Sequence, residues 1–348
     1  MFKVAHYAYL HTLVTIFSKR LLSCHQFSSL IKLPIEKILP ALKNKGFEQI
    51  INKLSGSNLT LLPAGNMDNL FLLVLLKDAR SIIRSLSGIE RDFFIYWIRR
   101  FELQNIKTIL RGKSLQHPKE EIHNELTPMG TFSTLPIDEL LNADNIPEIL
   151  TQLEKTSYAE IARYGRKSFD QKQDVFSIET AINHQYFTGL KKQFNVLDDE
   201  DKKLLQPILG RIIDQTNLIW LLRYRLKYNL SSSHTYFLLI SGGLHLNSQS
   251  LILLSQIEKL EQIYRILPYE INSLLENADS IHKIELILEK DINQVARSLL
   301  KSNSFSLTHA FSYLLLREKQ LSQIHALLKG KLLHLADDEI AFAMGEKW

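Results

Sequence analysis

Apolar residues recur at spacings of three and four along most of the chain, which is the period of one buried face of an α-helix. Six segments carry this pattern most clearly: 30–42, 82–98, 146–161, 178–190, 204–226 and 281–300. Strict alternation of apolar and polar residues over the length of a strand is hard to find. The pattern therefore predicts an all-α fold.

The N-terminal residues allow two interpretations. An uncharged run at 4–18, followed by Leu-Leu-Ser-Cys at 21–24, resembles a signal peptide with a lipoprotein cleavage box. Two histidines interrupt the run, however, and Lys19 and Arg20 stand where apolar residues should continue, so we expect an amphipathic helix of the mature protein. The longest other uncharged stretch, 229–257, contains polar residues that lipid would leave unpaired, and no transmembrane segment is predicted.

Three distant segments share one pattern of polar, apolar and basic residues. They read Glu102-x-x-Asn105-Ile106-x-x-Ile109-Leu110-Arg111-x-Lys113, Asp214-x-x-Asn217-Leu218-x-x-Leu221-Leu222-Arg223-x-Arg225 and Gln320-x-x-Gln323-Ile324-x-x-Leu327-Leu328-Lys329-x-Lys331. The amides of successive copies are 112 and 106 residues apart, and a glycine follows each copy, at 130, 242 and 345. Because a recurring period marks a repeated structural unit, we predict three similar helical units in tandem, at 1–130, 131–243 and 244–348.

A further acid keeps step with two of the copies. Glu179 and Glu285 each lie 38 residues before the amide of the second and third copies, and the first unit has no clear counterpart.

Helical geometry assigns roles to the motif residues. The acid, the amide and the last basic residue fall on the apolar face, where buried polar groups must be hydrogen-bonded. We therefore expect a structural motif that docks neighbouring helices, made of Glu102, Asn105, Lys113, Asp214, Asn217, Arg225, Gln323 and Lys331. By the same geometry, the side chains of Arg111, Arg223 and Lys329 lie on the opposite side of the helix from the apolar face. If a pseudo-threefold axis relates the units, these three form a basic surface for acidic partner groups; the alternative is three solvated charges.

Composition narrows the classes of function. The 348 residues include only 13 glycines and 9 prolines, which disfavours turn-rich β folds, and the single cysteine, Cys24, excludes an intrachain disulfide. A net charge of +5 is too small to indicate nucleic-acid binding, although it suits an anionic membrane surface. Gly112-Lys113-Ser114 lacks the first glycine of a phosphate-binding loop, and neither a zinc-binding His-Glu-x-x-His nor a Gly-x-Ser-x-Gly motif occurs. We expect no catalytic, cofactor or metal site.

The threefold motif resembles that of the C subunit of prokaryotic V-type (A-type) ATP synthases, whose eukaryotic relative is the d subunit of the V-ATPase. The N-terminal segment from Tyr7 to Leu22 is also similar to the start of that family, so the resemblance covers nearly the whole chain. The third copy departs from the pattern, with Gln320 in place of the acid and Gln323 in place of asparagine.

The resemblance implies a non-catalytic part of a rotary motor. In that family three helical units around a pseudo-threefold axis form a funnel-shaped socket, which sits on the cytoplasmic face of the membrane proteolipid ring and receives the rotor stalk. Such a protein is peripheral to the membrane and couples ATP synthesis or hydrolysis to proton or sodium transport. The alternative function is a general α-helical scaffold for other partners, although the observed period greatly exceeds the roughly 33 to 47 residues of common helical repeats.

Overall fold

The computed structural model describes residues 2–54, 64–276, 278–302 and 305–345, and within these ranges the chain forms helices, turns and loops with no β-strand. The all-α prediction is confirmed. In chain order the elements are α1 (Phe2–Ser18), α2 (Cys24–Ile31), α3 (Ile35–Ala41), α4 (Glu48–Leu54), α5 (Ala64–Arg84), α6 (Gly88–Ser114), α7 (Lys119–Glu125), the 3-10 turn η2 (Gly130–Phe132), α8 (Ile137–Asn142), α9 (Ile146–Leu153), α10 (Ala159–Lys172), α11 (Val175–Asn195), α12 (Asp199–Leu222), the π-helical turn η3 (Arg223–Lys227), α13 (Ser232–Phe237), α14 (Ser248–Leu254), the 3-10 turn η4 (Leu260–Arg265), α15 (Tyr269–Asn272), α16 (Ile281–Lys301), α17 (Leu307–Leu332) and α18 (Asp337–Ala343).

The periodic segments are helical, but non-helical residues that the period alone does not reveal interrupt three of the six. Segment 30–42 is divided before Pro34, because the residue preceding a proline is pushed out of the helical region. Segment 82–98 is divided at 85–87, where Gly88 takes a positive φ of 52°. Segment 146–161 is divided between α9 and α10.

Polar side chains fix where several helices begin. Asn145 accepts a hydrogen bond from the backbone N–H of Glu148 at the start of α9, and Asp174 accepts one from Ser177 at the start of α11. Asp198 accepts two such bonds at the start of α12. Such caps supply partners to the first N–H groups of a helix, which have none within it.

The chain divides into two compact units, each made of separate stretches of sequence. The first unit contains Met1–Arg91, Asn124–Ser133 and Leu299–Trp348, and the second contains Asp92–His123 and Thr134–Ser298. Helix α6 begins in the first unit and continues into the second, so these units do not follow the repeats of the sequence. The three-unit division remains a prediction about the repeated pattern.

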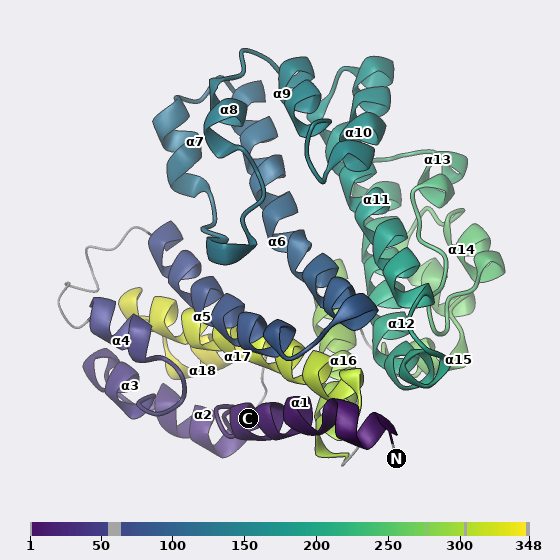
Figure 1. Ribbon diagram of the computed structural model, residues 1–348. Coiled ribbons are helices and arrows are strands. Elements are labelled where there is room, and N and C mark those ends of the chain that lie inside the picture. Colours follow the sequence, from purple (N-terminus) through teal and green to yellow (C-terminus); the bar gives the residue numbers. More distant parts are fainter. Residues whose placement is uncertain (1, 55–63, 277, 303–304, 346–348) are drawn as a thin grey trace. The chain divides into compact units, whose positions relative to one another are not determined.

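Each unit has its own core. In the first, α17 packs against α5, α1, α3 and α18 (Figure 1). Most residues of α17 are buried. In the second, α10 packs against α9 and α11. A separate apolar cluster of that unit runs from Leu218 on α12 to Leu288 on α16.

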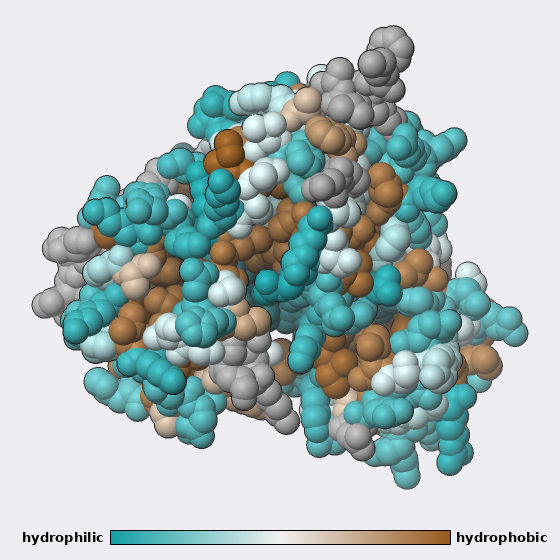
Figure 2. All heavy atoms as spheres, turned by 90° about the horizontal axis from the view of Figure 1, so that it is seen from below, coloured by the Kyte–Doolittle hydropathy of each residue, from teal (hydrophilic) through white to brown (hydrophobic). Residues whose placement is uncertain are grey.

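The surface is mixed in polarity. Seen from below, hydrophobic side chains reach the surface between hydrophilic ones (Figure 2). Exposed apolar area is normal for a folded protein and marks no site by itself. Among the described residues, no helix combines the length and the apolar character that crossing a bilayer requires.

Candidate functional site: the motif helices and their ends

The three sequence motifs lie on the long helices α6, α12 and α17, which we call the motif helices. On α6 the acid Glu102 is buried and accepts hydrogen bonds from the backbone N–H groups of Thr134, at 2.5 Å, and Leu135, at 3.0 Å. The hydroxyl of Tyr158 also donates to this carboxylate, and burial followed by the charge of Glu102 raises the pKa of that phenol. Glu102 therefore joins α6 to the chain about thirty residues later.

Asp214 does the same on α12. Its carboxylate accepts hydrogen bonds from three successive backbone N–H groups, at 3.1 Å from Leu244, 2.8 Å from His245 and 3.1 Å from Leu246. Burial raises the pKa of Asp214, and the backbone donors oppose that rise. The motif acid again holds a loop that lies about thirty residues later.

Gln320 occupies the third position, on α17, and its partner is the N-terminal part of the chain. Its side-chain oxygen accepts from the backbone N–H of Leu22 at 2.6 Å, and its nitrogen donates to the carbonyl of Arg20 at 3.1 Å. This segment offers one donor and one acceptor, whereas the other two loops offer only donors. An amide therefore fits where the first two copies need a carboxylate.

The three anchored segments stand in the same register. Leu135, Leu246 and Leu22 are all buried, and each lies two residues before the first residue of a short helix, α8, α14 and α2 respectively. The first and second motifs thus each hold a segment about thirty residues later in the chain. The third motif holds the segment that joins α1 to α2.

The motif amides are buried as well. Asn217 makes a two-point contact with the backbone of Ile240, accepting at 2.8 Å and donating at 2.7 Å. Gln323 donates to the carbonyl of Met344 at 3.2 Å. Asn105 is also buried on α6. The two residues contacted by Asn217 and Gln323 lie shortly before the glycine turns at Gly242 and Gly345, which have positive φ.

The outward basic residues of the first two copies are ion-paired. Arg111 binds both oxygens of Glu179, with Nη2 at 2.6 Å from Oε2, and Arg223 Nη2 lies 2.9 Å from Oε2 of Glu285. The hydrogen bond to Glu179 raises the pKa of Arg111. About half of each arginine side chain remains exposed. Whether they also bind acidic groups of a partner stays a prediction.

The third copy has a counterpart that the sequence spacing missed. Glu179 and Glu285 are each the fifth residue of their helices, α11 and α16, and the fifth residue of α5 is Asp68. Its Oδ1 lies 2.9 Å from Nδ1 of His325, one turn before Lys329. Asp68 lies 37 residues before Asn105, so it does not match the spacing of 38 residues shared by Glu179 and Glu285.

The last basic residue of each motif lies near the end of its helix. Arg225 Nε donates to the carbonyl of Ile257 at 3.0 Å, and Nη1 donates to that of Leu230. Nζ of Lys331 lies 2.7 Å from Oδ1 of Asp337. The side chain of Lys113 is half-buried.

The motif helices also end alike. The carbonyl of Gly112 accepts from the N–H of His117, and that of Gly330 accepts from Leu335, each past a residue with positive φ, Gln116 or His334. The carbonyl of Tyr224 accepts from Leu230, one residue further on. The π-helical turn η3 absorbs this extra residue.

The end of each motif helix exposes one apolar side chain. Leu115 and Leu333 directly precede the residues with positive φ, and Tyr228 precedes Asn229 in the same way. These apolar side chains lie within one or two turns of Arg111, Lys329 and Arg223. The sequence pattern did not single them out, although a leucine two residues after the last lysine is visible in the first and third copies.

A buried cluster of charges in the first compact unit also escaped sequence-based prediction. Asp78 on α5 accepts from the hydroxyl of Tyr313 at 2.6 Å and from Nη1 of Arg20, and its Oδ2 lies 3.2 Å from Nε of Arg317. Arg317 also donates to the carbonyl of Lys45 at 2.9 Å. An arginine six residues before the motif amide recurs in every copy, at 99, 211 and 317, and would have been the signal.

Within the described residues no group of three His, Cys, Asp or Glu side chains is arranged to hold a metal ion. Cys24 is exposed.

Comparisons with known proteins identify the family of the chain. The family model described as ATP synthase (C/AC39) subunit matches residues 10–341. A relative from Methanosarcina barkeri, named as the C subunit of an A-type ATP synthase, is 24% identical, and the match covers 97% of this chain and 92% of the relative. Relatives of the same name from Haloquadratum walsbyi and Methanocaldococcus jannaschii are 24% and 23% identical, over 90% and 70% of this chain and 91% and 62% of their own lengths. Since the model spans nearly the whole chain, the protein belongs to the ATP synthase (C/AC39) subunit family.

Proposed function

We propose that this subunit of a rotary ATPase is its non-catalytic central-rotor spacer. It acts as a socket that connects the rotor stalk to the membrane proteolipid ring, at the cytoplasmic face of the membrane. In this position it couples ATP synthesis or hydrolysis to proton or sodium transport. The proposal includes the three repeat units at 1–130, 131–243 and 244–348 and their arrangement around a pseudo-threefold axis.

The observation that supports a mechanical role is the way each motif helix is anchored. Glu102, Asp214 and Gln320 each make at least two hydrogen bonds to or from the backbone of a segment distant in sequence. Buried polar contacts of this kind specify one arrangement and oppose sliding of the helix, because a displaced donor or acceptor would be left unpaired. A part that transmits torque needs such resistance to shear.

The exposed ends of the motif helices are the proposed docking points. Arg111, Arg223 and Lys329 lie there, close to an exposed apolar side chain in each copy. A guanidinium carries five N–H donors, so an arginine that gives two of them to an internal glutamate keeps others for an acidic group of a partner. An exposed apolar side chain beside a cation resembles a protein interface, which combines an apolar core with a polar rim.

A pull-down of the tagged chain from membranes, with mass spectrometry of the bound proteins, tests the role. Recovery of both proteolipid-ring and stalk subunits is expected, and the purified chain should hydrolyse no ATP. Recovery of unrelated proteins without ATPase subunits would instead identify a general helical scaffold, and reproducible turnover by the pure chain would identify an enzyme.

A charge-reversal variant tests the docking points. The triple variant Arg111→Glu, Arg223→Glu, Lys329→Glu should assemble poorly while keeping its helical circular dichroism. The matched control is Lys37→Glu, Lys155→Glu, Lys301→Glu, which reverses three other exposed charges and should assemble normally. Equal assembly of the two variants would contradict the docking assignment.

A further inference from the structure

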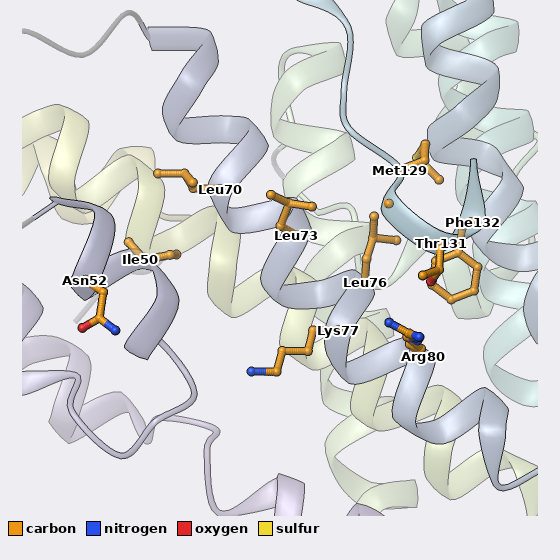
Figure 3. A pocket seen from close by; sticks show the side chains of 11 residues that line it. Ile50, Asn52, Leu70, Leu73, Leu76, Lys77, Arg80, Met129, Thr131 and Phe132 are labelled. Atoms are coloured by element: carbon orange, nitrogen blue, oxygen red, sulfur yellow. The ribbon is translucent and has the colours of Figure 1, made fainter. Parts of the chain in front are cut away.

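A cavity of about 590 Å³ opens beside α5 in the first compact unit. We call it the α5 cavity. Its apolar wall comes from α4, α5 and the segment around η2, and consists of Ile50, Leu70, Leu73, Leu76, Met129 and Phe132. Figure 3 shows α5 crossing the view, with Ile50 on one side and Met129 and Phe132 on the other. The volume falls within the range of roughly 300 to 1,000 Å³ that small-molecule sites occupy.

Two basic side chains also line the α5 cavity. Lys77 and Arg80 lie on α5 one turn after Leu73 and Leu76, and both side chains are exposed. Within the described part of the chain neither side chain forms an ion pair. An apolar wall with two available cations beside it matches a ligand that has an apolar chain and an anionic head.

The backbone near the cations is also accessible. Gly130 lines the cavity with a φ of +55°, and no atom lies within 4 Å of the position that a Cβ would occupy there. Open space at this point lets a bulky head group approach the rim between Arg80 and Thr131, which Figure 3 places near one another.

We propose that the α5 cavity binds an anionic phospholipid. One acyl chain lies along Leu70, Leu73 and Leu76, and the phosphate lies against Arg80 beside Gly130, with Lys77 adding positive charge from the neighbouring turn of α5. A lipid fits the site better than a peptide helix does, because the two exposed cations beside the apolar wall match an anionic head group. The inference uses only residues of the first compact unit and is independent of the rotor role.

The test is calorimetric titration of the full chain with dihexanoyl phosphatidylglycerol, kept below its micelle-forming concentration. Saturable binding at one site is expected. Dihexanoyl phosphatidylcholine, which has the same chains but no net charge, should bind at least tenfold more weakly. Glycerophosphoglycerol, which has the same phosphodiester head group and charge but no acyl chains, should not bind measurably. Equal affinity for the two lipids, or binding of glycerophosphoglycerol as tight as that of the lipid, would overturn the proposal.

Variants locate the binding. Lys77→Gln with Arg80→Gln should weaken phosphatidylglycerol binding at least tenfold, and so should Leu73→Gln, a change at a half-buried position that the fold should tolerate. The control Lys37→Gln with Lys43→Gln removes two exposed charges from the same unit but outside the cavity. If the control weakens binding as much as the cavity variant, the attraction is a general charge effect and the site is wrong.

A photo-crosslinking amino acid in place of Leu73, in the assembled complex in cells, separates lipid from protein occupants. Recovery of a phospholipid adduct is expected. A crosslink to another protein chain, with no lipid adduct, would show that the cavity receives a partner and would overturn the lipid assignment.

Discussion

Replacing Asp78 by asparagine tests how the first compact unit is held together. The Asp78 side chain is 3% exposed and faces Arg317, which is 0% exposed, as well as Arg20 and Tyr313. Asp78→Asn removes the negative charge and leaves the guanidinium of Arg317 buried without a counter-ion. Breaking a buried ion pair from one side costs about 3–5 kcal/mol.

A matched pair elsewhere provides the control. Arg211 stands six residues before Asn217, as Arg317 stands before Gln323, and its Nε lies 2.8 Å from Oδ2 of Asp291. These side chains are 25% and 20% exposed, so water can solvate whichever partner remains. Asp291→Asn should therefore cost about 1 kcal/mol or less.

The assay is urea denaturation followed by circular dichroism, together with hydrogen exchange of the α17 amides. Hydrogen exchange is needed because the chain has two compact units, which can unfold separately. Asp78→Asn should reduce protection in α17, whereas Asp291→Asn should leave it unchanged. Adding Arg317→Met to Asp78→Asn should cost less than the sum of the single changes, since it removes the orphaned charge. Equal losses in Asp78→Asn and Asp291→Asn would refute the reasoning.

Three further predictions concern single side chains. Gly112→Ala places a Cβ 2.5 Å from Cγ1 of Ile122 and should cost about 1–3 kcal/mol in urea denaturation, and combining it with Ile122→Ala should cost less than the sum of the two single changes. Burial lowers the pKa of His309 from 6.5 to about 4, so the folded state binds fewer protons than the unfolded state and stability should fall as pH drops from 6.5 to 4; His309→Phe should flatten that fall in the urea midpoint. Gln320→Glu replaces the donor to the carbonyl of Arg20 by an acceptor, and thermal unfolding should show a loss of about 1–3 kcal/mol.

Helical periodicity predicted the class of fold because it depends only on local spacing. It also predicted correctly that Glu102, Asp214 and their amides lie on a buried face. It missed the helix breaks near Pro34 and Gly88, where apolar residues happen to keep their spacing across a turn. The break at Pro34 follows from the sequence, because a proline disfavours the helical conformation of the residue before it. The break at Gly88 depends on a positive φ, which only the structure shows.

The partners of the motif residues were beyond the reach of local patterns. Glu102, Asp214 and Gln320 each meet a backbone segment, and the side chains of these three segments carry no shared polar pattern that would mark them in the sequence. Arg111 and Arg223 looked like free charges on a helical wheel, yet both bind glutamates from another helix. The spacing of 38 residues identifies both glutamates, but it does not show which side chains they bind.

The contact between Gln320 and the segment at Arg20 and Leu22 differs from the other two motif contacts in its separation along the chain. Covalent linkage brings the loops at 134–135 and 244–246 to Glu102 and Asp214, because each loop follows its motif by about thirty residues. No such linkage brings Arg20 and Leu22 to Gln320, which is nearly three hundred residues away in sequence. The extra loop-closure entropy must be offset by contacts. Arg317, one turn before Gln320 on the same helix, and its partner Asp78 add contacts to this N-terminal part of the chain, through the carbonyl of Lys45 and the guanidinium of Arg20.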